Sequence, residues 1–61
     1  MVIIQVKHNT IDTWDVAVQN EANGSIVYIS HNVVKEEAYR KSDIMKRWLS
    51  LLDVRSKVVE V

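Results

Sequence analysis

The chain has 61 residues, with eight basic and eight acidic side chains, so its formal net charge at neutral pH is zero. This length predicts one domain over residues 1–61 and excludes a two-lobed enzyme or a deep internal cofactor pocket. The charge balance argues against a polyanion or membrane-surface binder, and the absence of Cys excludes disulfides and thiolate metal sites. Because small domains often need such cross-links, we expect oligomerisation or a partner protein.

The first predicted element is a strand over residues 2–7, in which Val2, Ile4 and Val6 share one face. Its apolar run is too short for a signal peptide, and no stretch reaches the roughly 18 residues of a membrane span. We therefore expect a cytoplasmic protein and, because the chain starts with Met, a complete small gene product. A following loop of three or five residues would keep the apolar face of this strand on the side of Trp14.

Asn23-Gly24 is the clearest turn signal, because both residues tolerate the positive φ angles of a type I′ hairpin turn. A two-residue loop at this point pairs Val18 with Ile29 in a hairpin. The face expected to be buried then contains Trp14, Val16, Val18, Val27 and Ile29. The opposite face contains Asp15, Ala17, Gln19, Glu21, Ile26, Tyr28 and Ser30.

From residue 33 to about residue 52 the apolar spacing becomes that of an α-helix, with Asn32 as the predicted N-cap. One face of this helix, about 160° wide, contains Val34, Ala38, Ile44, Met45, Trp48, Leu49, Leu51 and Leu52. We expect that face to cover the sheet and to place Trp48, like Trp14, in the core. The other side has acid-before-base pairs at i,i+4 spacing, which are Glu36–Arg40, Glu37–Lys41 and Asp43–Arg47.

Residues 54–61 are rich in β-branched side chains and predict a last strand. The predicted fold class is therefore α+β, in the order β-β-β-α-β. One amphipathic helix lies on one face of a small, mainly antiparallel sheet, which makes a two-layer sandwich. The last strand runs parallel to the first and third and can lie beside either one. Val58 and Val59 are both apolar, so the pattern leaves its inward face open.

Catalytic motifs are scarce. His8 and His31 are the only good acid–base groups near neutral pH, and both end strands that run in the same direction. Together with Asp12 and Asp15 they could form an acid–base or metal cluster, and the alternative is a pair of ordinary histidines at loop edges. The chain has no metal-ligand spacing, activated-serine motif or glycine-rich phosphate loop. We therefore predict no enzyme activity, no catalytic residue, no metal site and no cofactor.

Two surfaces are predicted to bind a protein partner or a second copy of the chain. The first is the sheet face away from the helix, with Ile3 opposite Ala17, Tyr28 opposite Gln19, and Ile26 nearby. The second is the polar side of the helix, where an aromatic has no packing reason to occur and lies among basic residues. Its predicted contact residues are Tyr39, Arg40 and Arg47.

Nucleic-acid binding is the alternative prediction. Residues 35–57 hold seven bases and four acids, whereas residues 1–34 have an excess of acids. The basic residues predicted to contact nucleic acid are Arg40, Lys46, Arg47, Arg55 and Lys57. A salt-bridged solvent face is the competing interpretation of the same residues.

Trp14-Asp15-Val16 and Lys35-Glu36-Glu37-Ala38 resemble the W-x-V strand and the K-x-E-A helix opening of certain small bacterial domains of uncharacterised function. No site or activity is carried over from this resemblance. The short chain without Cys, Pro or catalytic motifs is also similar to many phage-encoded small proteins that bind and inhibit a larger host factor. The leading prediction is a non-catalytic protein-binding module that acts as a regulator or inhibitor, with a homodimer as one form.

Overall fold

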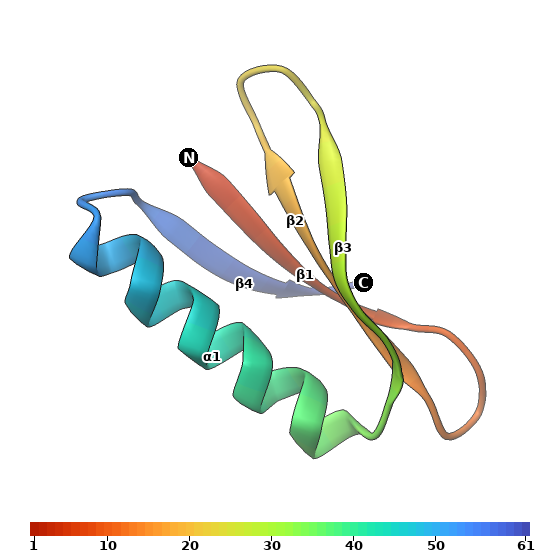
Figure 1. The fold of residues 1–61 in the computed structure, drawn as a ribbon. Helices are drawn as coiled ribbons and strands as arrows, with labels where there is room; N and C mark the ends of the chain where they lie inside the picture. The colour runs from red at the N-terminus through yellow and green to blue at the C-terminus, as the bar shows by residue number, and fades with distance from the viewer.

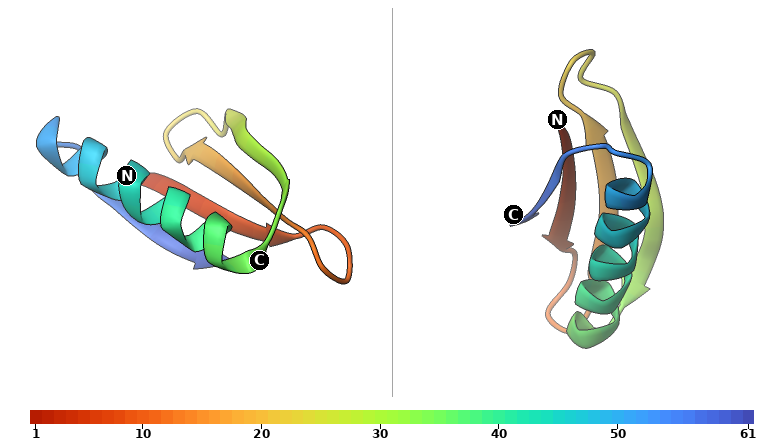
Figure 2. Two further views of the ribbon diagram at one scale, coloured as in Figure 1. Left: turned by 60° about the horizontal axis from the view of Figure 1, so that its bottom comes forward. Right: turned by 90° about the vertical axis from the view of Figure 1, so that its left-hand side faces the viewer.

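The computed structural model describes all 61 residues as three strands, a helix and a last strand (Figure 1). The elements are β1 (Val2–His8), β2 (Trp14–Asn20), β3 (Ile26–Val33), α1 (Lys35–Leu51) and β4 (Ser56–Glu60). The sheet order is β3-β2-β1-β4, and α1 packs on one face of this sheet (Figure 2). The predicted α+β fold is confirmed. The last strand, β4, pairs with β1 in the parallel direction. Of the two positions that the sequence allowed, beside the first or the third strand, it therefore occupies the first.

The β1–β2 connection matches the five-residue loop that the apolar pattern allowed. His8 lies opposite Trp14, and Val6 lies opposite Val16, so the apolar faces of both strands point the same way. The predicted pairing of Ile3 with Ala17 is wrong, because Ile3 lies opposite Gln19. This shift of two residues leaves every side chain on its predicted face, since side chains alternate with a period of two.

The β2–β3 hairpin has a longer loop than the predicted two-residue turn. The N–H of Asn20 donates to the carbonyl of Ser25 at 2.9 Å, which leaves residues 21–24 as the loop. Gly24 closes it with a φ of 74°, a left-handed conformation that glycine adopts without strain. The side chain of Asn20 accepts from the N–H of Ala22 at 3.0 Å, and this bond favours the wider turn. Val18 consequently pairs with Val27 and not with Ile29.

Strand β3 also departs from a regular ladder at two places along β2. Tyr28 lies opposite Ala17, not Gln19, whereas Val16 lies opposite Ser30, so Ile29 is an extra residue in β3. Beyond it, Asn32 adopts a φ of 55°. The bulge brings Ser30 opposite Val16, where it is buried at 9% exposure, and leaves Ile29, which was expected to be buried, 37% exposed.

The core is small and lies between α1 and the middle of the sheet. Ile4, Val6, Val16 and Ala38 are fully buried. The hydrophobic residues packed around them are Trp14, Val33, Met45, Leu49 and Val58. Trp14 is therefore confirmed as a core residue. The contact of Val58 also decides which face of β4 points inward.

The apolar face of α1 is only partly buried, which corrects the predicted core. Ala38, Met45 and Leu49 contact the sheet, and Ser42 is buried between them on the same stripe. The predicted core residues that remain exposed are Val34, Ile44, Trp48, Leu51 and Leu52. A contact stripe on one helix needs an arc of about 100°, so an arc of 160° exceeds what one small sheet covers.

The start of α1 differs from the prediction. The N-cap is Val34, without a side-chain cap hydrogen bond, and Asn32 belongs to β3. The predicted Asp43–Arg47 ion pair is present at 2.9 Å. Arg40 pairs with Glu37 at i,i+3 and not with Glu36. These pairs are exposed, so their contribution to stability is small.

Candidate functional site

The domain leaves a group of apolar side chains uncovered on the side of the sheet that α1 occupies. We call this group the helix-side patch, and it consists of Val27, Ile29, Ile44, Trp48 and Leu51. The exposed fraction is 62% for Trp48, 79% for Leu51 and 63% for Val27. Exposed apolar groups of this size on one face are typical of contact surfaces.

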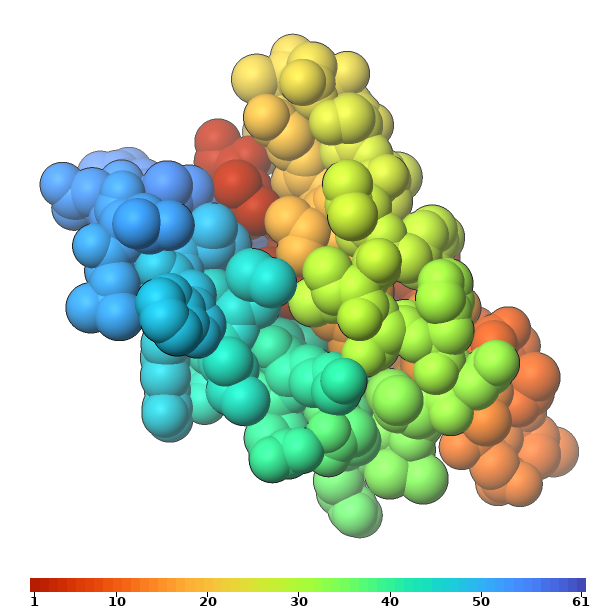
Figure 3. Space-filling view, viewed as in Figure 1, coloured from red at the N-terminus to blue at the C-terminus, as the bar shows by residue number.

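The two walls of the patch come from α1 and β3. With about 100° between successive helical residues, Ile44, Trp48 and Leu51 fall on one flank of α1. Tyr39 falls on the opposite flank and donates a hydrogen bond to Glu60 of β4, so the flank with Trp48 faces β3. Figure 3 shows α1 and β3 diverging on this face, with atoms of β1 and β2 visible in the notch between them. The patch is thus two apolar walls around a shallow notch.

The register of the sheet explains why Val27 remains exposed. Val58, Ile4, Val18 and Val27 form one inward row across the four strands. Val58 and Ile4 lie in the core under α1, whereas Val18 is half-buried and Val27 is exposed. One helix is too narrow to cover four strands, so the β3 end of the row is free for another molecule.

The opposite sheet face is less apolar than the sequence predicted. Ile3 and Ile26 lie in one row on either side of Gln19, and Gln19 accepts a hydrogen bond from Gln5 at 3.0 Å. Tyr28 lies in the next row, opposite the fully buried Ala17. The face thus brings Ile3, Ile26 and Tyr28 close together, but polar side chains separate them.

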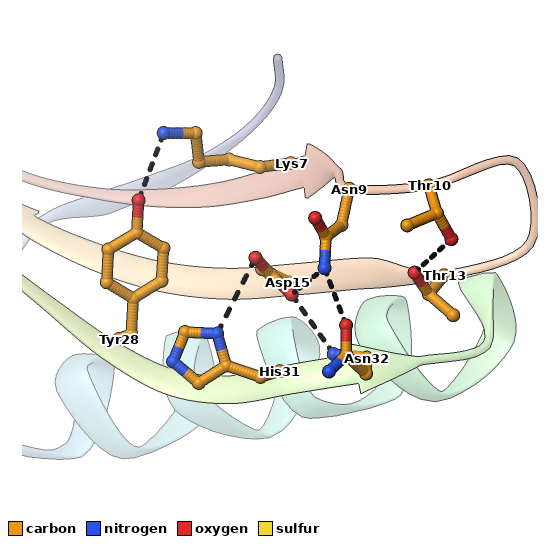
Figure 4. Close-up of polar contacts among 8 residues, drawn as sticks. All are labelled: Lys7, Asn9, Thr10, Thr13, Asp15, Tyr28, His31 and Asn32. Atoms are coloured by element: carbon orange, nitrogen blue, oxygen red, sulfur yellow. Dashed lines mark hydrogen bonds and ion pairs between the residues drawn. The ribbon is translucent and has the colours of Figure 1, made fainter.

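Tyr28 belongs to a polar network at the end of this face (Figure 4). Its hydroxyl accepts from the ammonium group of Lys7 at 3.1 Å, and its ring stacks on His31 with centroids 5.0 Å apart. His31 Nδ1 lies 3.5 Å from Asp15 Oδ2. The network therefore links β1, β2 and β3 across the open face.

Asp15 is the centre of that network. Its Oδ1 accepts the backbone N–H of Asn32 at 3.0 Å and the side-chain amide of Asn9 at 3.4 Å. The Asn9 amide also donates to the side-chain oxygen of Asn32 at 2.5 Å. The Asp15 side chain is only 15% exposed. Because Asn32 is in the left-handed region, these bonds hold the irregular end of β3 against β2.

The two histidines lie on opposite faces of the sheet and do not form the cluster that was weighed against ordinary loop-edge positions. His8 stacks on Trp14 with ring centroids 4.4 Å apart, on the side of the sheet that faces α1. His31 lies on the open face beside Asp15. No group of three or more His, Cys, Asp or Glu side chains is placed to hold a metal ion. His31 therefore has a structural contact in the network around Asp15, and His8 has one with the ring of Trp14.

The predicted contact residues on α1 are engaged within the chain. Arg40 donates two hydrogen bonds to Glu37, at 3.0 and 2.6 Å, and Arg47 pairs with Asp43. The bond from Arg40 lowers the pKa of Glu37, and the same bond raises the pKa of Arg40. The Glu60 carboxylate that accepts the Tyr39 hydroxyl raises the pKa of Tyr39. Tyr39 therefore has a packing role at the β4 edge, which the sequence pattern did not indicate.

The ionisation of Tyr39 can be measured directly. Because the hydrogen bond to Glu60 stabilises the neutral phenol, its contribution persists while Tyr39 is protonated and is lost as pH rises through the raised pKa. In Glu60→Gln the acceptor loses its charge, so the pKa of Tyr39 should fall back toward its ordinary value. An absorbance titration at alkaline pH with Tyr28→Phe as the common background isolates this phenol. An unchanged titration curve in Glu60→Gln would contradict the assignment.

The five basic residues predicted to contact nucleic acid do not gather on one face. Lys46 and Arg55 line an open hollow with Met1 and Asp53. Arg40 and Arg47 are paired with acids of α1. Lys57 is in β4 opposite Ile3, so it lies on the open face of the sheet. These residues therefore do not form the continuous basic stripe that would follow a nucleic-acid backbone.

The helix-side patch was missed by sequence reasoning, because its residues match the pattern of a buried face. Ile44, Trp48 and Leu51 have the correct helical spacing, and Val27 alternates correctly along its strand. The available signal was the width of the helical arc, which exceeds the stripe that one contact needs.

Helix α1 is neither long nor apolar enough to cross a membrane. No protein-family model, curated protein or solved structure matches this chain.

Proposed function

We propose that this chain is a small, non-catalytic protein-binding module that acts in the cytoplasm as a regulator or inhibitor of a larger protein. The observation that carries the proposal is the exposure of Trp48, 62%, within the apolar helix-side patch. Tryptophan is enriched among residues that dominate protein interfaces, and large apolar side chains form their dry centres. Leu51 and Ile44 lie one turn to either side of Trp48 on α1 and supply that apolar surrounding.

A protein partner fits these residues better than nucleic acid does. The patch is apolar, and next to it on α1 an acidic residue, Glu37, lies among the basic residues Arg40 and Lys41, whereas nucleic-acid surfaces depend on unpaired Lys and Arg that neutralise phosphates. Two of the five candidate bases, Arg40 and Arg47, already contact carboxylates. Ile3, Ile26 and Tyr28 on the open face form a smaller second surface for the same type of partner.

Capture from an extract of the source cell tests the proposal. Immobilised wild-type protein should retain a larger protein in stoichiometric amount, and Leu51→Lys should lose it. Leu51 is 79% exposed, so the substitution places a charge in the patch without disturbing the core. Ile11→Lys is the matched control, because Ile11 is 88% exposed in the β1–β2 loop, away from the patch.

Retention of the partner by wild type and by Ile11→Lys, with loss in Leu51→Lys, is the expected result. Equal retention by all three proteins would show that the patch is not the contact surface. Circular dichroism of each variant checks that α1 and the sheet are intact.

A further inference from the structure

We infer that the helix-side patch also binds a second copy of the chain, forming a two-fold symmetric dimer in which the two α1 helices pack antiparallel. The inference rests on the proposed function in that it uses the same surface. It adds the identity of one occupant, which follows from the area, shape and charge of the patch.

The exposed area is in the range of a weak dimer interface, in which less than about 600 Å² is buried on each partner. The five side chains of the patch expose roughly 500 Å² of apolar surface, near the upper end for the largest patch on a monomer. A standard interface buries about 800 Å² on each partner. Leu52, which is 69% exposed directly after α1, and the polar rim of the notch would supply the remainder.

The shape of the patch is complementary to itself under a two-fold axis. In such an interface each contact occurs twice, so a protruding element must meet a recess on the same surface. Trp48 and Leu51 are exposed on the flank of α1. The notch that Figure 3 shows between α1 and β3 is the recess. Ile44 lies one turn before Trp48, so antiparallel pairing places Ile44 of one copy against Trp48 of the other.

Charge does not oppose this pairing. The chain has a formal net charge of zero, so two copies do not repel each other at neutral pH. The charged residues on or next to the same flank are Glu37, Arg40 and Lys41. Glu37 and Arg40 are paired with each other, and Glu37 and Lys41 are partly buried. Antiparallel helices also align their dipoles favourably.

The small core provides a reason for the second copy. Only seven of the 61 residues are buried, and five of these are hydrophobic. A domain of this size is marginally stable alone. Association through the native state raises the stability of the fold as protein concentration rises, so burying Trp48 and Leu51 would add to a core that one chain cannot complete.

Sedimentation equilibrium over a range from about one micromolar to about one millimolar tests the inference. Wild type and Ile11→Lys should associate to a dimer with the same dissociation constant. Leu51→Lys and Trp48→Lys should each raise that constant at least about 30-fold, the loss expected at the centre of an interface. Both side chains are exposed, so both variants should keep the circular dichroism spectrum of wild type.

Wild-type protein that stays monomeric at one millimolar would overturn the dimer, and so would a dimer that Leu51→Lys does not weaken. Either result can be separated from the proposed function. Capture from the cell extract is carried out at nanomolar concentration, below the range of the sedimentation experiment, and it reads out the larger partner by its mass. If the protein stays monomeric but captures a larger protein, the dimer is wrong and the proposed function is supported. If it dimerises but captures no larger protein, the dimer is supported and the proposed function is wrong.

Discussion

Replacement of Trp14 by alanine should lower the free energy of unfolding by about 3 kcal/mol, whereas the same replacement at Trp48 should lower it by less than about 1 kcal/mol. Trp14 packs against the core, stacks on His8, and has the Lys35 ammonium 5.2 Å from its ring centre. Trp48 is 62% exposed and lies about 20 Å along α1 from Lys35, the helix residue beside Trp14. The two tryptophans therefore have different roles.

Urea unfolding at low micromolar concentration measures both effects, because dilution removes any contribution from association. A domain of 61 residues has a total stability of roughly 3 to 9 kcal/mol, so Trp14→Ala should lose at least about a third of it and unfold at a much lower urea concentration than wild type. Trp48→Ala should unfold at nearly the wild-type urea concentration. Equal destabilisation by the two substitutions would mean that Trp48 is part of the core.

Replacement of Asp15 by alanine should lower the free energy of unfolding by about 2 kcal/mol, the range for hydrogen bonds to a charged acceptor with limited exposure. The Asp15 carboxylate accepts from the backbone of Asn32 and from the Asn9 side chain, and it contacts His31. Its removal leaves the left-handed Asn32 without its main partner. The end of β3 should then separate from β2.

Asp12→Ala is the matched control for charge, because Asp12 is exposed in the loop before β2. Thermal or urea unfolding gives the stability difference, and amide hydrogen exchange locates it. The Asn32 amide should exchange faster in Asp15→Ala than in Asp12→Ala. Similar stability and exchange in the two variants would show that the carboxylate does not hold the bulge.

The order of elements could be predicted because the sequence patterns are local. Alternation in residues 2–7 and helical spacing from residue 33 onward identify strands and helix without any tertiary information. An odd length of the β1–β2 loop also followed, because only an odd loop keeps Val6 and Val16 on one face, but the pattern did not choose between three and five residues. The register of the strands could not be predicted from alternation alone, since a shift of two residues changes the paired residues but not the faces on which they lie.

The bulges of β3 could not be predicted because their causes are distant in the sequence. Asn32 N–H bonds to Asp15, 17 residues away, and Asn9 bonds to Asn32 across 23 residues. The turn depended on Asx bonds by Asn20 and Asn23, whose wider loop competes with the two-residue Asn-Gly turn. Because β3 has this extra residue, Ser30 is buried opposite Val16 and Ile29 is exposed.

The candidate site was mispredicted for a related reason. Apolar spacing shows that Ile44, Trp48 and Leu51 can face a core, but it does not show whether one chain supplies enough surface to cover them. Tyr39 is the converse case, because its position on the polar side of α1 indicated a binding role. Its bond to Glu60 depends on β4 lying beside β1, which the sequence pattern left undecided.

The contact role of Trp48 is tested most directly by the two indole N–H signals in a ¹H–¹⁵N NMR spectrum, assigned with Trp48→Phe. As protein concentration is raised, or as a captured partner is added, the Trp48 signal should shift or broaden while the Trp14 signal stays in place. Trp14 is already packed within the chain, whereas Trp48 is exposed in the patch. Association that leaves the Trp48 signal unchanged would contradict the assignment of the helix-side patch as the contact surface.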